Sequence, residues 1–225
     1  MESPSIEIFE VRASIYGLLA TLLYSEPSSE MLEKTREQLG FVKGMFRLWS
    51  EPAFAANVQN LLNAMEQSIP ENLAVDYAGL FLGGKEGLTC PSESSYLEKI
   101  LYGQTTLRVM EFYAQHGFAK DDSFHEPDDH IAVECAFMSV LGCNFIEMAR
   151  SEGMDSAQCH KQLELQLHFL TEHLMKWIPD WANQVRDFSE TDFYRALAGL
   201  TQTWIEADQR LLINSLHTHQ NSVGG

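Results

Sequence analysis

The sequence is poor in basic residues. It has 15 lysines and arginines against 32 aspartates and glutamates, a formal net charge of −17 at pH 7 with neutral histidines. A surface this acidic repels nucleic-acid phosphates and anionic lipids at long range. We therefore expect neither nucleic acid nor a membrane surface as a partner. A cationic peptide would be attracted, although an acidic balance also serves solubility alone.

Long apolar runs are also missing. The first apolar stretch, residues 16–24, is nine residues long and is interrupted by Thr21, whereas a membrane-spanning helix needs about 20 apolar residues. Residues 1–5 contain no basic side chain, so they do not have the pattern of a secretory signal peptide. We expect a cytoplasmic protein without a membrane span.

The sequence also lacks closely spaced cysteines. It has four cysteines, Cys90, Cys135, Cys143 and Cys159, and no two of them form a C-x-x-C motif. A zinc ribbon or a thioredoxin-like site is therefore not indicated. Cys135 and Cys143 are eight residues apart, about two helical turns. This spacing favours buried free thiols on one helical stripe in a reducing compartment.

Catalytic motifs are missing as well. The sequence has no G-x-S-x-G, and Gly83-Gly84-Lys85 lacks the spacing and the Ser or Thr of a phosphate-binding loop. His125 and His130 are five residues apart with Pro127 between them, which does not fit the H-E-x-x-H motif of zinc proteases. We predict no catalytic residue, no metal and no cofactor.

Apolar residues recur at three- and four-residue steps through most of the chain, which predicts helices. We expect helices over residues 5–24, 94–118 and 155–174, a short helix ending near residue 188, and a last helix over 191–216. The fold class is all-α: a single globular helical bundle of about nine or ten helices over residues 1–214, with 215–225 as a flexible tail. Trp177 and Trp181 could form a binding surface, but large aromatics beside a helix break favour the core.

The densest polar cluster directly precedes a predicted helix that begins at Ile131. It consists of Glu126, Pro127, Asp128, Asp129 and His130. One aspartate could cap the helix, or His130, Glu134 and an aspartate could hold a metal. The cluster could also form an acidic pocket for an arginine-rich peptide.

The polar connection over residues 119–128 is a candidate hinge. A connection of this length could let the C-terminal helices exchange between two chains. The sequence therefore leaves open a monomer or a domain-swapped dimer.

Several segments together resemble the TorD/DmsD family of redox-enzyme maturation chaperones. Residues 126–130 (EPDDH), followed by IAVE, are similar to the family's E-P-x-D-H signature. Residues 76–83 (DYAGLFLG) resemble its Y-x-x-L-F stretch, and residues 91–97 (PSESSYL) resemble its P-x-E-S-x-Y/W element. The segments 169–181 and 193–198 are similar to its closing helices, so the resemblance covers most of the chain beyond the first sixty residues.

The resemblance implies a helical chaperone that binds the twin-arginine signal peptide of a DMSO-reductase-type molybdoenzyme. Such a chaperone holds the apo form until the molybdopterin cofactor is inserted, and some members are said to bind guanine nucleotide. Carried over by position, the signature places Asp129 and His130 at the recognition site, shaped by Glu126, Pro127 and Asp128. The other elements add six residues: Tyr77, Leu80, Phe81, Pro91, Ser94 and Tyr96. Ser92 stands where some relatives have Trp, which is a departure from the family's second element in this part of the pocket.

Two alternatives stay open. One is a scaffold that docks the folded redox subunit instead of its leader. The other is a metal- or nucleotide-dependent hydrolase that uses Asp129, His130 and Glu134. Capture of a leader without turnover is the leading hypothesis.

Overall fold

The computed structural model describes residues 5–45, 51–83, 89–121 and 124–223, with side chains up to residue 217. Within these ranges the chain forms ten α-helices and one π-helical turn, which confirms the predicted all-α bundle. The elements are α1 (Ile6–Tyr24), α2 (Ser29–Gly44), α3 (Pro52–Gln67), α4 (Pro70–Phe81), α5 (Glu93–Leu97), α6 (Gln104–Gln115), α7 (Ile131–Glu152), α8 (Ala157–Phe169), η2 (Leu170–Leu174), α9 (Met175–Phe188) and α10 (Asp192–Val223).

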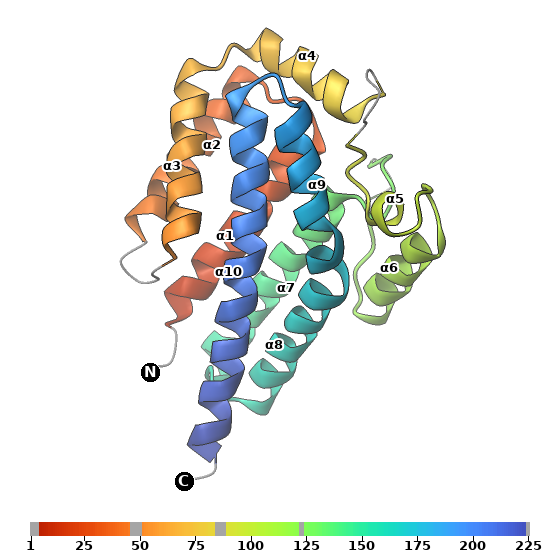
Figure 1. The fold of residues 1–225 in the computed structure, drawn as a ribbon. Helices are drawn as coiled ribbons and strands as arrows, with labels where there is room; N and C mark the ends of the chain where they lie inside the picture. Colours follow the sequence, from red (N-terminus) through yellow and green to blue (C-terminus); the bar gives the residue numbers. More distant parts are fainter. Residues whose placement is uncertain (1–4, 46–50, 84–88, 122–123, 224–225) are drawn as a thin grey trace.

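The core is built around α1, α7 and α10. α1 packs most extensively on α7, while α10 runs the length of the bundle and contacts α3, α8 and α9 (Figure 1). α4 crosses one end of the bundle, and α5 and α6 lie on one side of it (Figure 1). Gly142 lies where α1 and α7 approach each other closely, since a Cβ there would lie 3.0 Å from the Cβ of Ala13.

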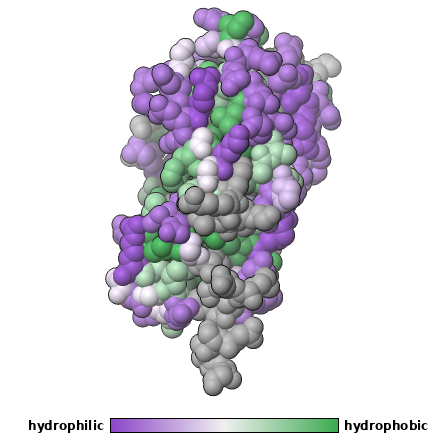
Figure 2. Space-filling view, turned by 90° about the vertical axis from the view of Figure 1, so that its left-hand side faces the viewer, coloured by the Kyte–Doolittle hydropathy of each residue, from purple (hydrophilic) through white to green (hydrophobic). Residues whose placement is uncertain are grey.

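α7 is the central helix of the core. By length and composition it could cross a membrane, but 61% of its apolar stretch is buried inside the molecule. The outer surface differs in character. Figure 2 shows the side that carries α2 and α3, where hydrophilic residues predominate and apolar residues appear only in patches.

The helix predicted over residues 94–118 is instead two helices, α5 and α6. The chain turns between them, with positive φ at Lys99 (60°) and Tyr102 (58°). The Glu98 carboxylate accepts hydrogen bonds from the backbone N–H of Gln104 at 2.9 Å and of Thr105 at 2.6 Å. Glu98 thus satisfies free N–H groups at the start of α6, so the turn is stabilised by a side chain that periodicity alone does not reveal.

The C-terminal helices differ from the prediction in their continuity and in the length of the last one. α8 continues through η2 into α9, where Pro179 lies inside the helix. α10 continues to Val223, and Ser215 and Leu216 are buried, so the predicted tail at 215–225 begins too early. Burial of an apolar face extends a helix beyond the point that sequence signals suggest.

Trp177 and Trp181 are fully buried, which confirms the prediction that they belong to the core. Cys135 and Cys159 are buried free thiols as predicted, but Cys143 is exposed. Eight residues at 3.6 per turn leave a rotation of about 80°, which carries Cys143 off the buried stripe of α7.

Candidate functional site

The two most specific sequence segments lie against each other. The backbone N–H of Glu93 donates to the carbonyl of Asp129 at 2.9 Å, and that of Ile131 donates to the carbonyl of Pro91 at 2.8 Å. These bonds flank an antiparallel β-bridge between Ser92 and His130. The bridge joins the start of α5 to the start of α7, so the tertiary structure brings the E-P-x-D-H and P-x-E-S elements into one site.

Asp129 is fully buried and connects three segments. Its Oδ2 accepts a hydrogen bond from the backbone N–H of Ser94 at 2.7 Å, and its Oδ1 accepts one from the Thr106 hydroxyl at 3.1 Å. The carboxylate therefore lies at the N-terminal end of α5, where negative charge is favourable. Asp129 positions α5 and α6 relative to α7.

His130 is the N-cap residue of α7, a role that the sequence assigned to Asp128 or Asp129. Its Nδ1 accepts a hydrogen bond from the backbone N–H of Ala132 at 3.1 Å. Burial, and secondarily the charge of Lys120, lowers the pKa of His130 to about 3. The imidazole is therefore neutral at pH 7, as an acceptor must be.

The segment before α7 is partly open to solvent. Glu126 is exposed, Pro127 is buried and Asp128 is half-buried. Lys120 Nζ lies 3.6 Å from Asp128 Oδ2 and also donates to the carbonyl of Glu126. The predicted hinge at 119–128 is thus tied across its two ends, although residues 122–123 lie outside the described chain.

The three predicted residues of α4 have different environments. Leu80 belongs to the core, Tyr77 is buried at its edge, and Phe81 is half-buried. The Tyr77 hydroxyl donates to the carbonyl of Tyr24 at 3.0 Å, and the Phe81 ring lies 5.1 Å from the Tyr77 ring. Phe81 also contacts Tyr194 on α10 at 5.8 Å.

These rings belong to a larger group, which we call the aromatic face: Tyr24, Tyr77, Phe81, Phe124 and Tyr194. Tyr24 is 44% exposed and stacks on Phe124 with ring centroids 4.6 Å apart.

Two exposed carboxylates, Glu26 and Glu126, border the aromatic face. Burial first, and then the nearby charges of Glu126 and Glu26, raise the pKa of Tyr77 to about 12. Sequence reasoning missed Tyr24, Glu26, Phe124 and Tyr194. They come from three distant segments, and no local pattern links them.

The remaining predicted residues lie on or beside α5. Pro91 and Ser94 are buried, and Tyr96 is half-buried. The Tyr96 hydroxyl donates to Gln184 on α9 at 2.8 Å, and its ring lies 5.4 Å from that of Trp177. Tyr96 therefore packs against α9 and makes no described contact with a ring of the aromatic face.

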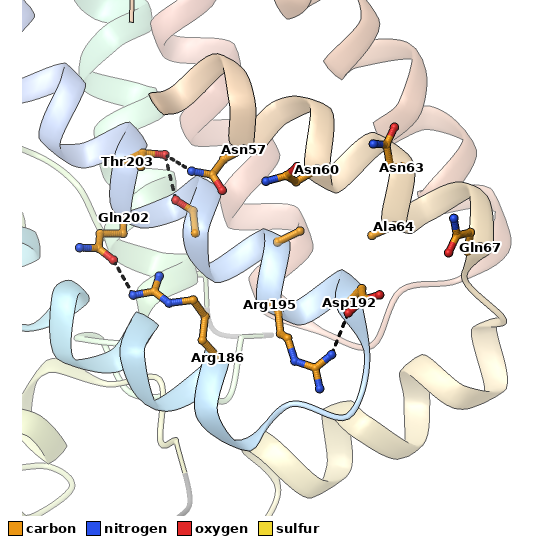
Figure 3. A pocket seen from close by; sticks show the side chains of 12 residues that line it. Asn57, Asn60, Asn63, Ala64, Gln67, Arg186, Asp192, Arg195, Gln202 and Thr203 are labelled. Atoms are coloured by element: carbon orange, nitrogen blue, oxygen red, sulfur yellow. Dashed lines mark hydrogen bonds and ion pairs between the residues drawn. The ribbon is translucent and has the colours of Figure 1, made fainter. Parts of the chain in front are cut away.

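A cleft of about 610 Å³ lies elsewhere, between α3, α9 and the start of α10. Carboxamides of α3 line one side and Arg186 and Arg195 the other, with Arg186 bonded to Gln202 and Arg195 paired with Asp192 (Figure 3). None of the residues predicted for peptide binding lines this cleft.

The three residue positions that the sequence offered as an alternative metal site, His130, Glu134 and an aspartate, do not form a group of ligands in the described part of the chain. Among the described residues, Glu134 gathers with Glu93 and His173, and His130 is not in that group. The structure therefore does not form the hydrolase site that Asp129, His130 and Glu134 would make. The Asp129 carboxylate accepts hydrogen bonds from Ser94 and Thr106, and the Nδ1 of His130 accepts one from the backbone N–H of Ala132.

Comparison with known proteins shows which proteins this chain is similar to. The family described as nitrate reductase delta subunit matches residues 51–183. Chaperone protein TorD of Shewanella oneidensis is 30% identical over 225 residues, covering 95% of this chain and 96% of that protein. Chaperone protein TorD of Vibrio cholerae is 28% identical and covers 90% and 92%, respectively. The crystal structure of a proposed redox enzyme maturation protein from Archaeoglobus fulgidus shares the fold, with a TM-score of 0.53, 22% identity, and coverage of 84% of this chain and 91% of that one.

Proposed function

Because the chain belongs to the TorD family of redox-enzyme maturation chaperones, we propose that it binds the twin-arginine leader of a molybdenum-containing oxidoreductase. It is a chaperone and not an enzyme, and an oxidoreductase is its partner. In the proposal, it holds the leader in the cytoplasm and supports cofactor insertion before export.

The aromatic face with its two bordering carboxylates is the observation that carries the proposal. Glu26 and Glu126 are exposed, and carboxylates form strong, charge-assisted hydrogen bonds with guanidinium groups. Tyr24, Phe81 and Phe124 offer apolar ring surface beside them, which suits the apolar segment of a leader. A basic and apolar peptide therefore matches both parts of this surface.

In this proposal five of the predicted residues divide into two groups. Glu126, Asp128 and Phe81 are accessible enough to contact the peptide. Asp129 and His130 are buried and hold the segments that carry the accessible residues. Asp129 and His130 are thus positioning residues, because a buried carboxylate that already has partners cannot pair with an arginine unless those bonds break.

Calorimetric titration with twin-arginine leaders tests the proposal. We expect saturable binding to one intact leader and loss of binding when its two arginines are replaced by uncharged residues. The double variant Glu26→Gln, Glu126→Gln should weaken binding by about a hundredfold or more, since charge-assisted bonds contribute on the order of 1.5–3 kcal/mol each.

The matched control is Glu33→Gln, Glu37→Gln. Both residues are exposed on α2, and the variant changes the net charge by the same amount. It should bind the leader nearly as the wild type does. Equal weakening in both variants would show that only the overall charge matters and would remove the proposed site.

Docking of the folded redox subunit is the second candidate function. The turn between α5 and α6 exposes apolar side chains: Leu97 (42%), Ile100 (58%), Leu101 (45%) and Tyr102 (65%). Such an apolar group on a projecting turn is typical of a protein-binding surface. Equal affinity for leaderless enzyme and full precursor would favour docking over leader capture.

Guanine nucleotide binding stays a prediction of the family resemblance. Titration with GTP and with GDP in the same calorimeter tests it. Turnover of GTP by the purified chain would contradict its assignment as a chaperone without enzymatic activity.

A further inference from the structure

Three ionisable side chains meet inside the molecule, close to the site but outside its aromatic face. They are Glu93 at the first position of α5, Glu134 in the first turn of α7, and His173 in η2. One ligand-type atom from each lies within 4.8 Å of the other two. All three residues are buried, with exposed fractions of 1%, 0% and 7%.

The hydrogen bonds of the group are incomplete. His173 Nδ1 lies 2.9 Å from Glu93 Oε2, and Trp177 Nε1 donates to Glu134 Oε2 at 3.2 Å. Glu134 Oε1 is buried and has no hydrogen-bond donor among the described residues, and the side chain that the Glu134 carboxyl group meets is a second carboxyl group, that of Glu93. Buried polar atoms are normally satisfied, so an orphaned carboxylate oxygen indicates a missing partner.

The ion pairs of the group also leave one of its two carboxyl groups without a cationic partner among the described residues. The described ion pairs give Glu93 one partner, His173, and give Glu134 none. Buried charges are ordinarily paired or coordinate metals, so this group requires a proton or a cation.

The backbone at His173 is irregular in a way that serves the group. Residues 170–174 form a π-helical turn within the continuous run from α8 to α9. Such turns are rare and occur frequently at functional sites, because the extra residue redirects side chains. His173, which lies in this turn, hydrogen-bonds to Glu93, and Trp177, which lies just after the turn in α9, hydrogen-bonds to Glu134.

A route from solvent also exists. A cleft of about 370 Å³ is lined by Glu93 and His173 and opens between α6 and the α8–α9 segment, where Glu111, His168 and Glu172 lie on its walls. A hydrated cation could therefore reach Glu93 and His173 through this cleft, whose wall also carries the cationic side chains of Arg108 and Lys176.

We propose that Glu93, Glu134 and His173 form a binding site for one divalent transition-metal ion that joins α5, α7 and the α8–α9 segment. Two carboxylates and one imidazole, without a thiolate, suit Zn²⁺ or Mn²⁺ better than Cu⁺. Metal–ligand distances of about 2.0–2.2 Å place the ligands of a tetrahedral ion roughly 3.3–3.6 Å apart, so the three side chains would close around the ion from separations of up to 4.8 Å. Trp177 would then orient the Glu134 ligand from behind, as outer-shell partners do.

The test uses the full chain, stripped with a chelator and titrated calorimetrically with ZnCl₂ and, separately, MnCl₂. We expect one equivalent of metal to bind per chain, because Glu93, Glu134 and His173 supply one set of ligands. Substitution with Co²⁺ should give visible d–d absorption. Metal should also raise the thermal midpoint by an amount that grows with its concentration, as binding to the native state requires.

Ligand variants locate the site. Glu134→Gln and His173→Gln should each weaken Zn²⁺ binding by at least about a hundredfold, because loss of an outer-shell partner alone costs 10- to 100-fold. The control His168→Gln, Glu172→Gln removes an imidazole and a carboxylate from the cleft wall and should bind as the wild type does. Absence of stoichiometric binding by the wild type, or unchanged binding in both ligand variants, would overturn the proposal.

The wild-type titration and its thermal shift test the metal site even if a ligand variant fails to fold. Leader binding is measured separately on metal-free protein. The proposed leader site can therefore fail while the metal site holds, and the reverse is equally possible.

Discussion

At the scale of single residues, burial decides what His130 can do. The residue is 2% exposed, its Nδ1 accepts the hydrogen bond that starts α7, and no ion pair among the described residues includes it. Burial lowers its pKa from 6.5 to about 3. A histidine in an acidic sequence motif suggests a cationic or catalytic group, but this one is a neutral helix cap.

The first prediction concerns the pH dependence of stability at His130. The unfolded chain binds a proton below about pH 6.5, and the folded chain does so only near pH 3, so the free energy of unfolding falls as pH drops between these values. From pH 7 to pH 5 this residue should cost about 2 kcal/mol. Urea unfolding of wild type and His130→Asn at both pH values measures it, since Asn also caps helices.

The Asn variant should therefore lose less stability on acidification than the wild type. A His116→Asn variant is the control, because His116 is exposed on the end of α6. If the wild type and His130→Asn lost stability in parallel, the buried neutral imidazole would be excluded.

At the scale of elements, a buried ion pair joins helices from opposite ends of the chain. Arg12 on α1 and Asp208 on α10 are both fully buried, with Nε to Oδ1 at 2.5 Å and Nη2 to Oδ2 at 2.9 Å. The Tyr16 hydroxyl donates to Asp208 at 2.7 Å, and Arg12 also donates to Gln166 on α8. The network connects α1, α8 and α10.

The second prediction is that Asp208→Ala destabilises the fold by about 3–5 kcal/mol, because it leaves the Arg12 guanidinium charged and buried without its partner. Urea unfolding at pH 7 measures the loss. The control is Glu10→Gln, which breaks the exposed pair between Glu10 on α1 and Arg150 on α7 and should cost less than about 1 kcal/mol. Similar losses in both variants would contradict the role of burial.

At the scale of the whole molecule, net charge governs encounter with a partner. The charge of −17 produces a field that attracts cationic peptides over a distance limited by the Debye length, about 10 Å at 0.1 M salt. The swapped dimer stays a prediction, which light scattering at two protein concentrations tests.

The third prediction is that the association rate of a twin-arginine leader falls by about tenfold between roughly 20 mM and 300 mM salt, while the dissociation rate changes little. Stopped-flow fluorescence measures both rates. A leader without its arginines provides the comparison and should associate slowly at either salt concentration. An association rate independent of salt would mean that steering by charge plays no part.

The sequence by itself determined the helical class and the family. Three- and four-residue apolar spacing reports a helix wherever it occurs, because the period belongs to the helix itself. The segments at 76–83, 91–97 and 126–130 likewise carry the family resemblance locally. The buried positions of Trp177 and Trp181 followed from the general preference of large aromatics for the core.

Only the tertiary structure decided which side chains act together. Arg12 meets Asp208 across 196 positions, and Glu93 meets His173 across 80. The break between α5 and α6 depends on where the Glu98 carboxylate lies. Local patterns carry backbone preferences, whereas the partner, burial and protonation of a polar side chain depend on groups that folding brings close from elsewhere in the chain.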